Sequence, residues 1–459
     1  MRRHDGIGLL VVCAVAGASL AAVPSCSDPT TQSVPQLSAE ALANPESCRS
    51  CHESAVREWE GSMHAYASED PIFVAMNRKM LREAKDVPKD TCTRCHAPYA
   101  ARLGLLPEGS GAESLPRERK GVTCIFCHTI DAVTGVHGGA VRTASDGLMR
   151  GGLRDPSPGA PHAAAYSALH DRESRDAASA CGACHDVVTP KGDALERTYA
   201  EWQGSVYGAE GPSLLTCGKC HMEGRDAPAA TTNGAPVRRI HDHSMPGVDL
   251  ALTPFPHAEE QKARVQAALD AVLLTKLCVR PSPSGVDVDV TLDNAFAGHD
   301  FPSGATHDRR VWVSLEAKDG DTMLLASGQV PAEKALFEAA KTDKNVWILG
   351  DTLEDERGKP VLFLWEGAKH SGTKLPPAVT NDPRDPRFVH SVTKVYGVPG
   401  LPTTVRMRVF LRAVDVDVLD ALVASGDLAP DLPARMPTME IRTAVREWTK
   451  DKGFGCVGP

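Results

Sequence analysis

The sequence predicts an α + β multidomain protein, with a mostly α-helical and loop segment followed by a β-sandwich-like domain. The first half holds five C-x-x-C-H motifs, separated by Gly, Pro and charged stretches with little strand alternation, which is typical of short helices and loops. After Pro281 and Pro283, apolar residues alternate at period two in several runs, which is typical of strands with one buried face. A chain of 459 residues is long enough for two or three such domains.

The N-terminal residues resemble an export signal. The chain opens with Met-Arg-Arg, and Gly6 to Val23 is almost free of polar residues, as in the n-region and h-region of a signal peptide. Val23-Pro-Ser-Cys26 is similar to the lipobox of bacterial lipoproteins, in which the Cys is lipidated. We therefore predict a signal peptide over 1–25 and a lipoprotein-type spacer over 26–45. The alternative is an ordinary cleaved signal in which Cys26 is incidental.

The region from 46 to 257 contains the C-x-x-C-H pattern five times. In this pattern the two thiols add to the two vinyl groups of one heme, and the adjacent His reaches the iron as its proximal ligand. The predicted heme-binding cysteines are Cys48, Cys51, Cys92, Cys95, Cys124, Cys127, Cys181, Cys184, Cys217 and Cys220, and the predicted proximal ligands are His52, His96, His128, His185 and His221. The motifs therefore predict a pentaheme c-type cytochrome domain over 46–257, with five heme c groups.

Zinc is the alternative cofactor for closely spaced Cys and His. Cys₂His₂ zinc sites place their His at a distance from the second Cys, whereas in all five motifs the His follows it directly. The aromatic content of 5% is low, and hemes would supply large flat apolar bodies in place of Phe and Trp. The net charge of −9, before any heme propionate is counted, argues against a nucleic-acid partner.

Two of the motifs are followed by a repeated sequence. Glu58-Trp-Glu-Gly-Ser-Met-His64 follows the first motif, and Glu201-Trp-Gln-Gly-Ser-Val-Tyr207 follows the fourth. Each copy runs on to a further motif, which indicates a duplicated two-heme unit with the Cys124 motif between the copies. C-x-x-C-H followed by E-W-x-x-S-x-H resembles the multiheme cytochrome superfamily that includes tetraheme carriers of ammonia oxidation, octaheme hydroxylamine oxidoreductases and pentaheme nitrite reductases.

This resemblance implies distal heme ligands as well. In such proteins the His after the Trp-Ser pair is often a distal ligand, and His64 stands at that position, whereas Tyr207 stands there in the second copy. His170 precedes the Cys181 motif as a distal His does in related sequences. His243 is preferred over His241, because it matches the family form H-x-x-P/L-G.

His137 is the last predicted distal ligand in this region, because glycines beside it let the backbone approach a porphyrin face. Methionine sulfur competes with imidazole as an axial ligand, although each Met is more often part of the core. The competing residues are Met63, Met222 and Met245.

The C-terminal part is predicted to contain a connecting helix over 258–283 and a β-sandwich-like domain over 284–459. The helix prediction is based on the spacing of apolar residues from Ala258 to Leu277. The strands rest on period-two alternation in three runs, Val286–Leu292, Arg310–Glu316 and Thr404–Arg412.

The stretch between the first two strands carries the motif A-G-H-x-F-P-S-G, with His299 at its centre. This motif, followed by Arg-Arg-x-Trp, resembles the appended β domain of many exported multiheme cytochromes. His299 either reaches back to a heme as a ligand or braces the turn itself, since a loop residue can serve function or fold. Cys278 and Cys456 bracket the domain, and a disulfide between them would be worth about 5 kcal/mol on the polymer model. The alternative is two unpaired thiols.

Two functions follow from these predictions, and the sequence favours the first. An electron carrier, located in the periplasm or on the outer membrane of a bacterium, would exchange electrons with redox partner proteins or quinol-linked donors and contact the membrane only through its lipid anchor. The alternative is an oxidoreductase that acts on a nitrogen or sulfur oxyanion at one open-site heme. All five motifs end in His rather than Lys, and Tyr207 is the one hint of such an exception. A third reading is a subunit of a polymeric heme wire.

Overall fold

The computed structural model describes residues 36–106, 111–156, 160–232 and 234–459. The predicted signal peptide and Cys26 lie outside these residues. The described part of the chain forms one compact unit. It contains no helix that is both long and apolar enough to cross a membrane.

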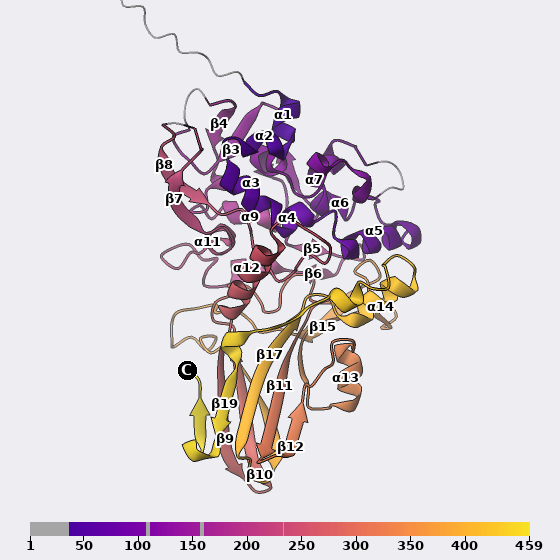
Figure 1. Ribbon diagram of the computed structural model, residues 1–459, viewed down its shortest axis with the longest axis vertical. Helices are drawn as coiled ribbons and strands as arrows, with labels where there is room; N and C mark the ends of the chain where they lie inside the picture. The colour runs from indigo at the N-terminus through magenta and orange to yellow at the C-terminus, as the bar shows by residue number, and fades with distance from the viewer. Residues whose placement is uncertain (1–35, 107–110, 157–159, 233) are drawn as a thin grey trace, which may run out of the picture. The chain divides into compact units, whose positions relative to one another are not determined.

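The residues from 36 to 257, called the motif segment below, are built from short helices (Figure 1). In chain order these are α1 (Ala39–Ala43), α2 (Pro45–Arg49), α3 (Glu53–Glu60), α4 (Met63–Tyr66), α5 (Pro71–Glu83), α6 (Thr93–His96), α7 (Pro98–Arg102), α8 (Cys124–Thr129), α9 (Ala177–Gly182), α10 (Thr198–Gly204) and α11 (Cys217–His221). Every C-x-x-C-H motif lies within or overlaps one of these helices. Residues three and four apart share a helix face, so each motif turns both thiols and its His toward one side.

The motif segment contains more strand structure than the sequence predicted. Four two-stranded sheets connect its helices, namely β1 (Ile130–Val133) with β2 (Val141–Thr143), β3 (Leu148–Gly151) with β4 (Ala163–Tyr166), β5 (Val187–Val188) with β6 (Ala194–Glu196), and β7 (Gly224–Pro228) with β8 (Val237–His241). These strands are two to five residues long, too short for alternation to be recognised in the sequence.

The predicted spacer over 26–45 is partly wrong, because its last residues belong to the folded body. Helix α1 begins at Ala39 after the N-cap Ser38. Leu42 and Ala43 are buried and pack against Ile125 of α8. A lipoprotein-type spacer must therefore end before α1.

The predicted connecting helix over 258–283 is also too long. Helix α12 covers Ala258–Asp270, and strand β9 already begins at Leu274 and ends at Ser282. Thr275, Leu277 and Val279 are buried on alternate positions of β9. This period-two pattern overrides the helical spacing that Leu277 suggested.

The C-terminal residues from 274 to 459, called the β region below, confirm the α + β prediction with two antiparallel sheets. One sheet has the order β16-β10-β9-β20, and the other has the order β14-β13-β11-β17-β18, with β12, β15 and β19 paired to β11, β13 and β17. The strands are β10 (Gly285–Asp293), β11 (Arg310–Asp319), β12 (Thr322–Ser327), β13 (Trp347–Glu354), β14 (Pro360–Val361), β15 (Lys369–Thr373), β16 (Val392–Pro399), β17 (Thr404–Arg412), β18 (Thr438–Glu440), β19 (Arg446–Thr449) and β20 (Gly455–Val457). The three predicted runs lie in β10, β11 and β17.

Alternate residues of both sheets form one apolar core. Val288 of β10, Val313 of β11 and Val409 of β17 are each 0% exposed and belong to the same cluster, as expected where two sheets pack face to face. The predicted disulfide is confirmed, because Cys278 of β9 is bonded to Cys456 of β20.

The β region also packs against the motif segment. Helix α14 (Val416–Ala424) contributes Leu419 and Leu422 to a cluster with Ile72 and Met80 of α5. The second helix of the β region, α13 (Leu336–Thr342), contributes Leu336 to the buried residues. The loop between β10 and β11 carries His299 to the motif segment.

Candidate functional site

Four of the five predicted proximal histidines are oriented by backbone carbonyl groups. The Nδ1 atoms of His52, His96, His128 and His221 lie 3.0, 3.1, 2.6 and 2.8 Å from the carbonyl oxygens of Ala229, Ala67, Arg150 and Pro246. A carbonyl oxygen only accepts, so each Nδ1 must carry the proton. This leaves the Nε2 lone pair free for a metal, the arrangement that fixes the tautomer of a ligating His.

Four of the proximal rings face a second imidazole at the spacing that one iron requires. A bond between a metal ion and an imidazole nitrogen is about 2 Å long, so two rings on opposite sides of an iron have centres about 6 Å apart. The pairs are His52 with His162 at 6.2 Å, His185 with His64 at 6.1 Å, His128 with His170 at 5.8 Å and His221 with His299 at 6.5 Å. The residues present therefore fit c-type hemes with two axial imidazoles.

His64 pairs with the fourth motif and not with its own. The hydroxyl of Ser62 caps α4 by accepting from the backbone N–H of Ala65, which fixes the helical turn that carries His64. Burial lowers the pKa of His64 to about 3 and that of His185 to about 4. Both rings are therefore neutral, the form that binds a metal.

His128 has two histidine neighbours, and both were predicted as distal ligands. The Nε2 atom of His170 lies 2.7 Å from the carbonyl oxygen of Cys127, which leaves its buried Nδ1 without a protein partner. The ring of His243 lies 6.4 Å from that of His128, and its Nδ1 lies 2.9 Å from the carbonyl oxygen of His241. His170 would thus bind through Nδ1 and His243 through Nε2.

The sequence did not single out His162 as a ligand, because no local motif marks it. It precedes β4, more than one hundred residues after its partner His52. Only the ring pairing across the fold identifies it.

His137 is not brought to any proximal ring among the residues that the structure describes. It is exposed in the turn between β1 and β2, with a φ of 81°. Its backbone N–H donates to the carbonyl of Gly182 in the Cys181 motif. The turn thus packs near a heme site through its backbone, and ligation by His137 stays a prediction.

The second motif differs from the other four. The ring of His96 stacks on Phe73 of α5, with centroids 4.2 Å apart and an interplanar angle of 11°. Within the described ranges, no ring pair joins His96 to another histidine. A neighbouring ring at this distance packs against the imidazole and leaves no room for a metal between them.

Thiols of different motifs lie beside one another. The Cys124 thiol lowers the pKa of Cys48 through a hydrogen bond, and the Cys184 thiol does the same for Cys95. The Cys217 thiol likewise lowers the pKa of Cys181. Because each thiol would hold the edge of its own heme, hemes attached to these motifs would be neighbours.

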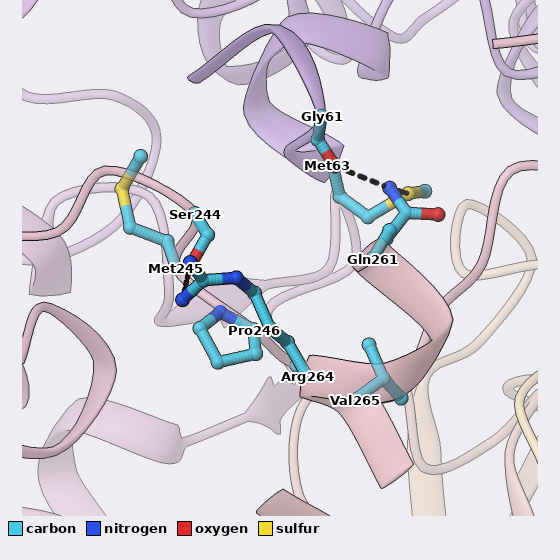
Figure 2. Close-up of a pocket in the computed structure, with 9 residues that line it drawn as sticks. Gly61, Met63, Ser244, Met245, Pro246, Gln261, Arg264 and Val265 are labelled. Carbon is cyan, nitrogen blue, oxygen red and sulfur yellow. Dashed lines mark hydrogen bonds between the residues drawn. The ribbon is translucent and has the colours of Figure 1, made fainter. Parts of the chain in front are cut away.

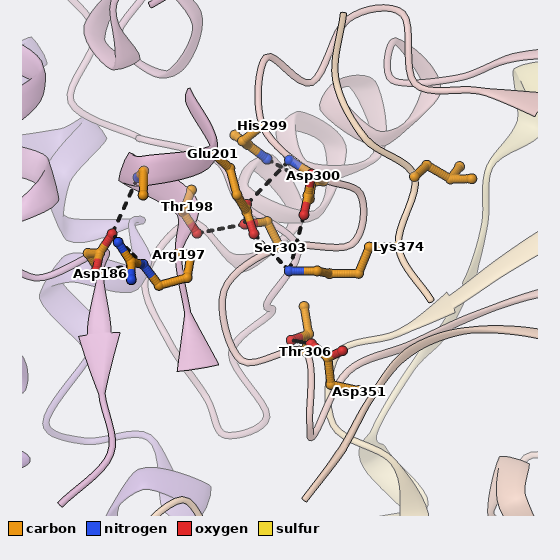
Figure 3. Close-up of polar contacts among 12 residues, drawn as sticks. Asp186, Arg197, Thr198, Glu201, His299, Asp300, Ser303, Thr306, Asp351 and Lys374 are labelled. Carbon is orange, nitrogen blue, oxygen red and sulfur yellow. Dashed lines mark hydrogen bonds and ion pairs between the residues drawn. The ribbon is translucent and has the colours of Figure 1, made fainter. Parts of the chain in front are cut away.

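The loop that carries His299 is fixed by a buried polar cluster between α10 and the β region (Figure 3). Lys374 donates to Glu201 at 2.8 Å and pairs with Asp300 at 3.1 Å, while the hydroxyl of Ser303 donates to Glu201 at 2.5 Å. Burial and the Glu201 carboxylate raise the pKa of Asp300 to about 6. Lys374 and Ser303 hold the loop against α10, and the Nδ1 of His299 lies 2.8 Å from the Asp300 carbonyl oxygen.

Tyr207 is a packing residue of the same junction. Its hydroxyl donates to the carbonyl of Ala295 at 3.0 Å, and its ring lies against Gly298. The side chain that replaces His64 in the second repeat thus supports the His299 loop.

Helix α12 braces the segments around His64. Gln261 donates to the carbonyl of Gly61 at 2.9 Å, and Arg264 donates to the hydroxyl of Ser244 at 3.2 Å. Figure 2 shows both side chains lining a small pocket together with Met63 and Met245. The Met245 sulfur lies 2.9 Å from the Nδ1 of His64.

The chain resembles known cytochromes in part of its sequence and in its fold. Residues 47–129 match the family model described as cytochrome c554 and c-prime. A crystal structure of a penta-heme cytochrome c552 from Thermochromatium tepidum has a TM-score of 0.58 and 20% sequence identity, and the alignment covers 89% of this chain and 99% of the other. A search of curated proteins finds no match. The family match supports a multiheme c-type cytochrome that transfers electrons, and the likeness to the solved structure shows a common fold.

Proposed function

We propose that this multiheme c-type cytochrome is an exported electron carrier with five covalently bound hemes. The observation that carries the proposal is the set of four facing imidazole pairs. An iron with two axial imidazoles has no free position for a substrate, and it supplies one-electron redox chemistry at low reorganisation. The count of five rests on the five motifs and agrees with the penta-heme neighbour.

The order of the hemes is proposed from the contacts between thiols. The Cys48 motif adjoins the Cys124 motif, and the Cys181 motif adjoins the Cys217 motif. The Cys92 motif adjoins the Cys181 motif through Cys95 and Cys184. Burial raises the pKa of Cys127, and the nearby Cys181 thiol raises it further, so we connect the Cys48 and Cys124 hemes to the other three at this point. Electrons would pass along this branched row, with the Cys181 heme at the branch.

Export and anchoring belong to the same proposal. The hydrophobic leader and the lipobox-like Val-Pro-Ser-Cys26 support lipidation at the cell envelope, either in the periplasm or on the outer membrane. The redox partners would then be envelope proteins or quinol-linked donors. Cys26→Ala should release the protein from membranes into the soluble fraction, and an unchanged membrane fraction would contradict the anchor.

A second candidate function is oxidoreductase activity toward a nitrogen or sulfur oxyanion at the Cys92 heme. The observation that favours it is the stacking of His96 on Phe73, with no paired imidazole among the residues described. An iron with a single protein ligand can accept a substrate.

The two functions differ in the molecule that accepts the electrons. The carrier, fully reduced, should pass its electrons to an oxidised soluble cytochrome, while nitrite, hydroxylamine and sulfite should give no sustained turnover. Turnover that Phe73→Leu changes and Tyr207→Phe leaves unchanged would establish the second function at the Cys92 heme. Tyr207→Phe is the matched control, because Tyr207 packs at the junction with the β region.

A further inference from the structure

Arg172 presents a buried guanidinium group with two unpaired nitrogen atoms. Its side chain is 12% exposed. Nη2 donates weakly to the carbonyl of Lys219 at 3.4 Å, whereas Nε and Nη1 are buried and have no hydrogen-bond partner. Leaving buried donors of a charged group unpaired costs more free energy than leaving those of a neutral group unpaired. A buried guanidinium in this state requires an acceptor.

The surroundings of Arg172 are basic. A Cβ atom at Gly224 would lie 2.1 Å from Nη1 of Arg172 and 2.7 Å from Nε of Arg239, so the two guanidinium groups converge on this glycine. His241 is half-buried on β8. Burial lowers the pKa of His241, and the nearby guanidinium of Arg172 lowers it further. Arg239 and His241 both lie on β8, and the guanidinium groups of Arg172 and Arg239 meet where Gly224 provides space.

The neighbouring carboxylates leave Nε and Nη1 of Arg172 without a hydrogen bond, while Asp226 pairs with Arg239 at 3.5 Å. Glu173 approaches Nε of Arg172 only to 3.9 Å, is 65% exposed, and is paired with Lys219 at 2.8 Å. The Asp171 side chain accepts from Tyr166 and Arg154 through one oxygen and from the backbone N–H of Glu173 through the other.

The position of Arg172 connects it to two heme sites. It follows His170, which faces His128, by two residues. Its carbonyl accepts from Thr216 at 2.6 Å, and a Cβ at Gly218 would lie 3.1 Å from its own Cβ, so its backbone packs on the Cys217 motif.

We propose that Arg172, with Arg239 beside it, binds a heme propionate and raises the reduction potential of that heme. The inference rests on the proposed function, because it requires hemes in the motif segment. A guanidinium donates charge-assisted hydrogen bonds to carboxylate oxygens, and the unpartnered Nε and Nη1 of Arg172 each offer an N–H donor for one. A fixed positive charge beside a heme disfavours the ferric iron, which carries one positive charge more than the ferrous iron.

The test is a spectroscopic redox titration of the mature protein with all hemes attached. Arg172→Gln should lower the midpoint potential of one heme and leave the heme content unchanged. Arg172→Lys should lower the potential less than Arg172→Gln does, because lysine keeps the positive charge but lacks the planar guanidinium donors. Gly224→Ala should shift the same heme in the same direction, because its Cβ would displace Nη1. Arg142→Gln is the control, an arginine paired with Asp131 on the surface.

Unchanged potentials in both Arg172→Gln and Gly224→Ala would overturn the inference. A second result would also overturn it. If added phosphate or nitrite shifts the potentials of the unaltered protein and Arg172→Gln abolishes that shift, the site binds a free anion and not a propionate. Neither result depends on which molecule accepts the electrons. The electron-carrier proposal would fail by a different result, namely sustained turnover of a substrate.

Discussion

The motif segment and the β region hold together in different ways. The β region has one apolar cluster that joins both sheets and includes Leu292, Leu315 and Leu411. The motif segment has several small clusters, such as that of Leu42, Ala43 and Ile125. The imidazoles and thiols of its C-x-x-C-H motifs are at most half-buried, and those of His96, His185 and Cys220 are exposed.

This difference shows where the cohesion of each region comes from. At about 25 cal/mol per Å² of buried apolar surface, the β region obtains its stability from its own side chains. Hemes bound to its C-x-x-C-H motifs would supply the motif segment with the large apolar surface that its own side chains lack. The two regions are joined by α14 and by the polar cluster around Lys374.

The largest effect should follow from blocking heme attachment. In a host without heme-attachment machinery, we expect the motif segment to lose its protection from amide hydrogen exchange, because its cofactor core is missing. Strands β10, β11 and β17 should keep their protection. Hydrogen exchange with mass spectrometry checks this, and equal loss of protection in both regions would contradict the comparison.

The next largest effect concerns the disulfide in the β region. Cys456→Ser should lower the free energy of unfolding by about 2–5 kcal/mol, because the Cys278–Cys456 bond restricts the unfolded chain. Urea unfolding followed by the fluorescence of Trp448 measures it. Cys278→Ser and the double variant are the controls, and both should match the single variant, since each breaks the same bond. Additive losses would show that the thiols act separately.

A single buried core residue should have an effect of similar size. Leu315 is 0% exposed in β11, and Leu315→Ala should cost about 2–5 kcal/mol through lost contacts and a cavity. Met323 is 44% exposed in β12, and Met323→Ala should stay within about 0.5 kcal/mol. Both are measured by denaturant midpoints. A loss for Leu315→Ala no larger than that for Met323→Ala would contradict the described core.

The smallest effect is expected at the junction of the two regions. Tyr207→Phe removes one hydrogen bond to Ala295 and should cost about 1 kcal/mol. The spin state of every heme iron should stay the same, because Tyr207 supports the loop of His299 and binds no iron. A changed high-spin signal in this variant would assign Tyr207 to a heme.

Much of the fold was predictable because its signals are local. Period two identified β10, β11 and β17, and the spacing of thiols and His identified the five motifs. The end of α12 was missed, because Leu277 satisfies both a helical and a strand period. The pairing of Cys278 with Cys456 was predictable, since no other cysteine outside the motifs lies in the described residues.

The distal ligands were only partly predictable, because ring pairing is a long-range property. His64, His170 and His299 were marked by sequence motifs, yet His64 faces a motif more than one hundred residues away. His162 lacks a motif, and His137 was favoured by its glycines alone. Which His faces which motif depends on how the helices pack against one another, and local sequence patterns do not predict that packing.

The most direct test of the central claim is the number of high-spin hemes in the oxidised protein by electron paramagnetic resonance. The paired imidazoles predict low-spin irons at four motifs and therefore no more than one high-spin heme. His64→Ala should add one high-spin heme without loss of any heme, since His64 faces His185. The variant is best made with Met245→Leu, because the Met245 sulfur lies 2.9 Å from His64 and could take its place. An unchanged high-spin count in the double variant would contradict the assignment of the facing pairs as axial ligands.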